Sequence, residues 1–181
     1  SPYAGYVTIN ISSPNTEGLR DFHDQKELEK LLTGINKIKK ENNLSKPLAL
    51  KLSPDIDDNE ISKIIELIIK YRISGIIVSN STEINRENLS DVKKNERGGL
   101  SGQPLRERST KLIKKFYNET KGKIQIIGVG GVDSGKAAFE KPDVFRSQAE
   151  VVAAMSDPRY DKDPAYRDDV FAKLSRSNVP Y

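Results

Sequence analysis

The chain has 181 residues and a mass of 20.2 kDa, which suffices for an ordinary domain with a buried core. It contains no cysteine, which excludes disulfides, thiolate metal sites and a cysteine nucleophile. A single histidine leaves almost no basis for a histidine metal cluster or a serine–histidine–aspartate triad, so we predict no metal site. The net charge of +4 is too small and scattered to argue for a nucleic-acid partner. Without an apolar membrane span or a secretion signal, we expect a cytoplasmic protein.

The composition changes near Pro142. All 18 isoleucines lie at or before Ile127, and residues 141–181 carry equal numbers of basic and acidic residues. Such a change indicates either a domain boundary or two segments of separate origin. We expect one domain over residues 1–141 and a second over residues 142–181.

Four short apolar runs in the first domain predict strands. They are rich in Ile, Val and Leu without polar alternation, which is typical of strands covered on both faces. The runs are Tyr6–Ile11, Pro47–Leu52, Gly75–Ser79 and Ile124–Val129.

Helical patterns separate these strands, because apolar residues recur on one face of each intervening segment. The three faces comprise Leu28, Leu31, Leu32, Ile35 and Ile38; Ile61, Ile64, Ile65 and Ile68; and Leu105, Leu112, Ile113, Phe116 and Tyr117. Asp57 or Asp58 is expected to cap the second helix, and Pro104 suits the first turn of the third. Alternating strands and helices predict an α/β fold with a parallel sheet. Spacing alone does not separate an open doubly wound sheet from part of a (β/α)8 barrel.

Small polar or flexible residues follow each predicted strand. Ser12–Thr16, Ser53–Asp55, Ser79–Thr82 and Gly130–Gly131 occupy these positions. The carboxyl ends of parallel strands converge on one opening, which is where α/β proteins bind ligands. The pattern therefore predicts a pocket for a polar, planar or phosphorylated ligand.

The segment Asn10–Arg20 reads NISSPNTEGLR and resembles the substrate loop of the dihydroorotate dehydrogenase family, in its quinone-linked class 2. Four later segments resemble further motifs of that family in order and spacing: Lys51–Asp55, Ser79–Thr82, Gly98–Leu105 and Ile127–Gly135. The resemblance covers about 140 residues. It implies a partial (β/α)8 barrel of about four βα units that binds FMN. The implied activity is oxidation of dihydroorotate to orotate in de novo pyrimidine biosynthesis, with quinone as the acceptor.

The resemblance assigns Ser13 the role of catalytic base, which removes a proton from C5 of dihydroorotate while hydride passes to the flavin. A serine hydroxyl is a poor base at neutral pH and needs a water relay and a closed site. The residues alone favour another interpretation, in which Ser12 and Ser13 form a hydroxyl–backbone turn before Pro14.

The same resemblance implies that Asn10, Asn15, Asn80 and Ser81 bind the substrate. The implied FMN ligands are Asn10, Lys51, Ser79, Ser101, Gly102, Gly130 and Gly131. An ammonium at the end of an apolar strand is costly unless it meets an anion, which the reduced flavin supplies. Without the resemblance, the asparagines are also explained as turn and cap residues, the lysine as reaching solvent and the glycines as tight turns. We expect His23 at the surface and Lys37–Lys40 on a solvated helix face.

The family pattern ends after Lys141, and its earlier strands are absent. A complete barrel takes roughly 250 residues, so we expect this chain alone to bind FMN poorly and to lack turnover. The part through which the family associates peripherally with membranes is absent too. A complementing barrel half is a possible partner.

Residues 142–181 predict a helical hairpin, with a capping box from Ser147 to Glu150 and a second helix starting at Asp163–Pro164. The pattern faintly resembles the C-terminus of phage scaffolding proteins. This leaves an alternative function, a non-enzymatic interaction module whose tail docks onto a partner protein. The hairpin is equally explained as a cover for an exposed edge of the α/β domain.

Overall fold

The computed structural model describes residues 3–84, 86–140, 148–175, 177 and 179. The chain divides into two compact units, Ser1–Ala137 and Ala138–Tyr181. Pro142, where the composition changes, and Ser147 of the predicted capping box lie outside the described residues.

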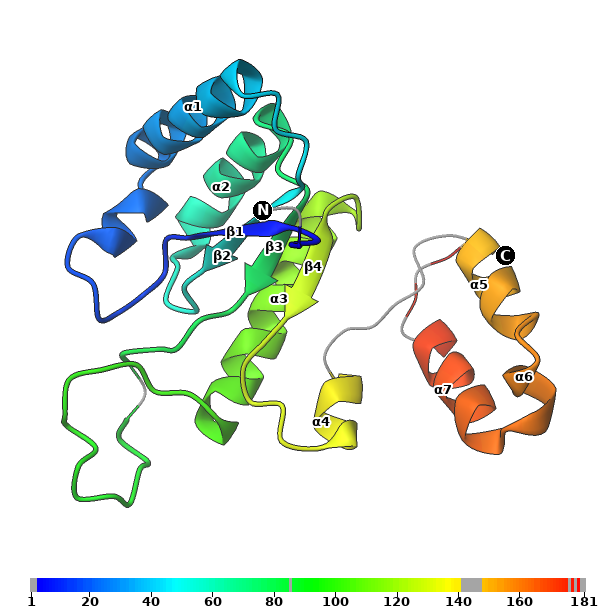
Figure 1. Ribbon diagram of the computed structural model, residues 1–181. Helices are drawn as coiled ribbons and strands as arrows, with labels where there is room; N and C mark the ends of the chain where they lie inside the picture. The colour runs from blue at the N-terminus through cyan, green and yellow to red at the C-terminus, as the bar shows by residue number, and fades with distance from the viewer. Residues whose placement is uncertain (1–2, 85, 141–147, 176, 178, 180–181) are drawn as a thin grey trace. The chain divides into compact units, whose positions relative to one another are not determined.

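Unit 1 contains a sheet of four parallel strands that lie side by side in the order of the sequence (Figure 1). The strands are β1 (Val7–Asn10), β2 (Leu48–Leu52), β3 (Gly75–Val78) and β4 (Gln125–Gly128). Each lies within one of the apolar runs, so the four predicted strands are confirmed. A doubly wound sheet reverses its strand order at a switch point, whereas a barrel keeps the sequential order. The sheet is therefore a segment of a barrel.

Helices return the chain between successive strands, and α1 packs beside α2 and α2 beside α3 (Figure 1). The α-helices of this unit are α1 (Gln25–Glu41), α2 (Asp58–Lys70) and α3 (Arg106–Thr120), and α4 (Gly135–Glu140) begins in it and ends in the second unit. Two 3-10 helices, η1 (Leu19–His23) and η2 (Gln103–Leu105), precede α1 and α3. Asp57 is the N-cap of α2, and its backbone N–H donates to Glu60 Oε2 at 2.9 Å.

The hydrophobic core lies between one face of the sheet and the helices. Leu50, Leu52, Ile76 and Val78 of the central strands are fully buried, as is Phe116 of α3. Alternate strand residues point to opposite faces, so these strand side chains all face the helices. Unit 1 therefore has its apolar layer on the helical side of the sheet.

One expectation about burial is wrong, and one apolar residue is more exposed than the others on its helix face. Ile38 is 55% exposed, because at about 100° per residue it lies at the margin of the apolar stripe. The outer strands were expected to be covered on both faces. Val7 of β1 and Ile127 of β4 are instead 42% and 40% exposed. These strands form the edges of the four-stranded sheet.

Unit 2 contains α5 (Gln148–Met155), α6 (Arg159–Lys162) and α7 (Pro164–Ser175). Val151 and Val170 are buried against each other, with partly buried residues around them. Asp163 Oδ1 accepts from the Ala165 N–H at 3.0 Å at the start of α7, where the sequence predicted a cap. The link between the two longer helices contains the short helix α6.

Among the described helices of both units, none is long and apolar enough to cross a membrane.

Candidate functional site

The sheet register brings Asn10 and Lys51 together at the carboxyl ends of β1 and β2. Their Cα atoms are paired across the two strands, and Lys51 is paired in turn with Ile77 of β3. Because Leu50 and Leu52 face the helices, Lys51 and Asn10 lie on the opposite, inner face of the sheet. The half-buried Lys51 has no hydrogen bond or ion pair to any other described residue. Its ammonium is therefore available to an anion on this face.

A hydrogen-bond chain joins Asn10 to Asn80, which follows β3. Asn80 Nδ2 donates to the Ser12 hydroxyl at 3.1 Å, and that hydroxyl lies 2.8 Å from Asn10 Oδ1. Ser12 is fully buried. The structure thus brings two of the four predicted substrate residues together through a serine to which the sequence assigned no ligand-binding role.

Ser13 forms the hydroxyl–backbone turn that the residues alone favoured. Its Oγ accepts from the Asn15 N–H at 3.3 Å and lies 3.4 Å from Thr16 Oγ1. Both contacts lie within the loop after β1, and Ser13 is half-buried. The turn fixes the position of this hydroxyl without linking it to a general base among the described residues.

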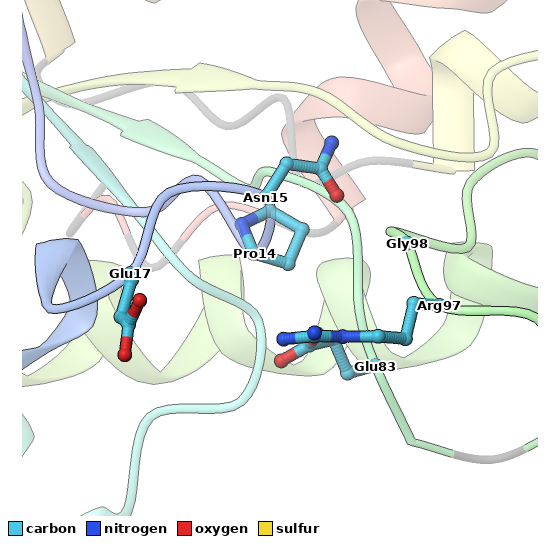
Figure 2. A pocket seen from close by; sticks show the side chains of 6 residues that line it. All are labelled: Pro14, Asn15, Glu17, Glu83, Arg97 and Gly98. Carbon is cyan, nitrogen blue, oxygen red and sulfur yellow. The ribbon is translucent and has the colours of Figure 1, made fainter.

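Asn15 lies elsewhere, in a cavity of about 480 Å³ between the loops that follow β1 and β3. Figure 2 shows the six residues that line it, which are Pro14, Asn15, Glu17, Glu83, Arg97 and Gly98. Asn10 and Asn80 are not among the lining residues. Asn15 is therefore not part of the hydrogen-bond chain that joins Asn10 to Asn80.

The first residues after β3 are held by backbone contacts. The Ser79 N–H donates to Val129 O at 3.0 Å, and the buried Ser79 hydroxyl donates to the carbonyl of Asn80 at 3.2 Å. The Ser81 N–H donates to Asn80 Oδ1 at 3.0 Å, and its carbonyl accepts from Arg20 Nη2 at 3.3 Å. These contacts fix the turn that carries Asn80 and Ser81.

Gly130 and Gly131 lie against the start of α3. A Cβ on Gly131 would stand 2.5 to 2.7 Å from Cβ, Cα and N of Arg106, and one on Gly130 would stand 2.9 Å from Leu105 Cδ2. Both glycines have a positive φ, which is +68° at Gly131 and +102° at Gly130. Glycine is therefore required here for the close approach of the strand end to α3.

Ser101 and Gly102 directly precede η2, which leads into α3, and both are exposed. The family resemblance implies that Ser101, Gly102, Gly130 and Gly131 contact the phosphate of FMN, and these four residues are grouped around the start of α3. Backbone N–H groups and the helix dipole make such a position favourable for an anion.

His23 was expected at the surface, and this prediction is wrong. The side chain is 6% exposed and connects η1 to the end of β2. Its Nδ1–H donates to Arg20 O at 2.8 Å, and its Nε2 accepts from the Ser53 N–H at 3.3 Å. These partners require the neutral ring. Burial lowers the pKa of His23, opposed mainly by the hydrogen bond to Arg20 and the charge of Glu60.

The buried, neutral His23 predicts that the protein loses stability as the pH falls below about 6.5, the ordinary histidine pKa. The unfolded chain then takes up a proton that the folded chain does not, at a cost of at most about 1.4 kcal/mol per pH unit. Urea unfolding followed by circular dichroism from about pH 7.5 to 5.5 measures this slope, and His23 is the only histidine. His23→Gln should remove the slope. A wild-type stability that is flat over this range would contradict the prediction.

Asp55 joins four segments near the same end of the sheet. Its carboxylate accepts from Thr82 Oγ1 at 2.5 Å and from the Glu83 N–H at 3.0 Å. It also lies 3.3 Å from Arg20 Nη1 and 3.4 Å from Arg108 Nε. No role was predicted for this residue, because its partners lie far away in the sequence.

The described residues fit the flavin that the sequence resemblance implies. Lys51 offers an unpaired ammonium on the inner face, and the start of α3 offers backbone N–H groups beside Gly130 and Gly131. No strand follows β4 among the described residues. The described residues therefore account for one part of a flavin site.

Comparison with known proteins relates the chain to dihydroorotate dehydrogenases. The sequence profile of the dihydroorotate dehydrogenase family matches residues 1–175. A dihydroorotate dehydrogenase (quinone) of Vibrio atlanticus is 44% identical over 144 residues, which are 77% of this chain and 43% of that protein. The same-named protein of Christiangramia forsetii is 41% identical over 139 residues and is covered over 41% of its length. The chain thus spans less than half the length of these relatives.

The fold comparison agrees. A ligand-free DHODH of Eimeria tenella superposes with a TM-score of 0.70 and 27% identity, over 94% of this chain and 51% of that one. A DHODH from the same organism in complex with ferulenol superposes with a TM-score of 0.72. The order of the strands, the motifs and both comparisons agree that the chain belongs to the dihydroorotate dehydrogenase family.

Proposed function

We propose that this chain forms the central part of a site that oxidises dihydroorotate to orotate with bound FMN, in de novo pyrimidine biosynthesis. The observation that carries the proposal is the arrangement on the inner face of the sheet. Asn10, Lys51 and Asn80 come from three successive strand ends, Ser12 links the two amides, and the lysine ammonium has no partner among the described residues.

Each group has a chemical part in this proposal. The amides of Asn10 and Asn80 hydrogen-bond the pyrimidine acid, and Lys51 holds the anionic edge of the cofactor. Bound FMN supplies the hydride acceptor. Ser13 takes the proton from the substrate, and the turn made with Asn15 and Thr16 fixes its hydroxyl beside the strand end that carries Asn10.

The proposal concerns the complete protein, of which this chain matches less than half. The inner sheet face is partly exposed, and β1 and β4 each have one unpaired edge within the described sheet. We propose that flanking barrel segments cover this face and complete the flavin site, and that a quinone accepts the electrons. The chain alone should then bind FMN weakly and show no turnover.

A chimera tests the function. Residues 1–137 replace the matching segment of the Vibrio cholerae relative, which is 44% identical over 145 residues. Stopped-flow absorbance then measures the rate at which dihydroorotate reduces the bound flavin. We expect Ser13→Ala to lower this rate by at least about a hundredfold and to leave the FMN content unchanged, since only proton transfer is lost.

The exposed Ser62 on α2 provides the control, and Ser62→Ala should reduce flavin at the parent rate. A Ser13→Ala chimera that reacts as fast as its parent would remove Ser13 from the catalytic role. A folded chimera that holds no FMN would contradict the proposed function as a whole.

A further inference from the structure

Two backbone groups fix the orientation of the side-chain amides at the candidate site. The Ser12 N–H lies 3.3 Å from the nearer amide atom of Asn10, and the Ser81 N–H lies 3.0 Å from that of Asn80. A backbone N–H only donates, so the atom that it meets must be a carbonyl oxygen. Both amides therefore have a defined orientation, with Oδ1 turned toward the protein backbone.

The Ser12 hydroxyl completes this arrangement and sets its direction. Asn80 Nδ2 donates to Ser12 Oγ at 3.1 Å, so the hydroxyl hydrogen is free to be donated onward. It reaches Asn10 Oδ1 at 2.8 Å. The result is a one-way chain from Asn80 through Ser12 to Asn10, in which each donor has an acceptor.

The hydrogen-bonding capacity that remains consists mainly of donors. Asn10 Oδ1 accepts two hydrogen bonds and Asn80 Oδ1 accepts one, whereas both N–H groups of Asn10 Nδ2 and one of Asn80 Nδ2 have no protein acceptor among the described residues. Lys51, paired in register with Asn10, also offers only donors. This end of the sheet therefore matches a ligand edge built from acceptors.

We propose that Ser12 is a positioning residue that holds Asn10 and Asn80 as hydrogen-bond donors and so makes the site selective for a carboxylate or carbonyl edge. The identification of that ligand as orotate rests on the proposed function. The role of Ser12 itself rests on its complete burial and its hydrogen bonds.

The first test needs no ligand and uses the chain as it is. Nuclear magnetic resonance measures hydrogen exchange and mobility of the side-chain amides, with the exposed Asn59 as the reference. In the wild type, the Asn80 amide should be at least about tenfold slower to exchange than that of Asn59, because one N–H is bonded to a buried hydroxyl. An Asn80 amide as mobile and as fast to exchange as Asn59 would overturn the proposal before any variant is made.

Ser12→Ala should raise the mobility of both amides while the far-ultraviolet circular dichroism stays unchanged. Ser53→Ala is the matched control, since Ser53 is also buried and its hydroxyl accepts from the Asp55 N–H and not from either asparagine side chain. Ser12→Thr keeps the hydroxyl and should preserve the ordered amides. Equal effects of Ser12→Ala and Ser53→Ala on Asn10 and Asn80 would contradict a positioning role.

The second test measures selectivity. Titration calorimetry compares orotate with its methyl ester, which lacks the carboxylate charge. Ser12→Ala should weaken orotate binding by about tenfold, the effect of one hydrogen bond, and should reduce the preference for orotate over the ester. If Ser12→Ala instead weakens the binding of orotate and of the ester equally, its effect is a general loss of stability, and this result would count against the proposal. The titrations use the chimera described above, and if the unmutated chimera binds neither compound, the proposed function fails, while the exchange measurement still decides the role of Ser12.

Discussion

Replacing Gly131 with alanine should destabilise unit 1 by about 2 to 5 kcal/mol. Two effects add at this position. The residue has a φ of +68°, where a Cβ costs about 1 to 2 kcal/mol. The new Cβ would also stand within 2.7 Å of three Arg106 atoms, two of them backbone, and such overpacking costs roughly 1 to 3 kcal/mol. Urea unfolding followed by circular dichroism measures the change.

Gly18 provides the matched control for Gly131. Its φ is +71°, but the nearest atom to an added Cβ is Asp21 Oδ2 at 3.5 Å, an ordinary contact. Gly18→Ala should therefore show the backbone effect alone, about 1 to 2 kcal/mol. If the two variants lose the same stability, the strand end after β4 does not pack closely against α3, and the phosphate position inferred there loses its support.

Asp55→Ala should lower the free energy of unfolding by about 2 to 4 kcal/mol. The Asp55 side chain is 12% exposed, and its removal leaves Arg20 and Arg108, 25% and 32% exposed, without their shared carboxylate. It also removes the acceptor for Thr82 and for the Glu83 N–H. Loss of one partner from a buried ion pair costs about 3 to 5 kcal/mol, and partial exposure of the arginines reduces this figure.

Asp58 provides the comparison for Asp55. It lies 2.5 Å from Lys115 and joins α2 to α3, but its side chain is 82% exposed. Asp58→Ala should cost less than about 1 kcal/mol, because solvent screens an exposed pair. The same urea titration measures both variants. Similar losses for Asp55 and Asp58 would mean that Asp55 does not hold these segments together.

The sequence predicts the strands and helices of unit 1 well, because their signals are local. Buried runs such as Leu48–Leu52 and the apolar face of α2 depend on residue type and period alone. Exposure of β1 and β4 was not predicted, since it depends on which elements lie beside them in space. Ile38 shows the same limit within one helix, because a residue at the edge of a stripe is buried only if a neighbour reaches it.

The candidate site was predicted in part. The rule that polar residues gather at the carboxyl ends of parallel strands predicts a ligand site that includes Asn80, and the family resemblance adds Asn10 and Lys51. The roles of Ser12, His23 and Asp55 could not be derived in this way, because each of them has a hydrogen-bond partner 27 or more residues away in the sequence. The role of Ser12 depends in addition on the direction of its hydrogen bonds. Ser13 as base and the glycines as phosphate ligands stay predictions.

The second unit has a small core of its own around Val151 and Val170. Val152 and Phe171 remain 57% and 52% exposed. The alternative function, in which this unit docks onto a partner protein, stays a prediction as well.

The central claim is that one end of the inner sheet face holds a flavin beside a pyrimidine acid. Its most direct test is a titration of the purified chain with FMN and with orotate, followed through the backbone and side-chain resonances of Asn10, Lys51 and Asn80. The account predicts saturable shifts at these residues, weak in the isolated chain, which Lys51→Met abolishes for FMN and the exposed Lys30→Met leaves intact. Absence of shifts at these residues, or shifts confined to the opposite end of the sheet, would contradict it.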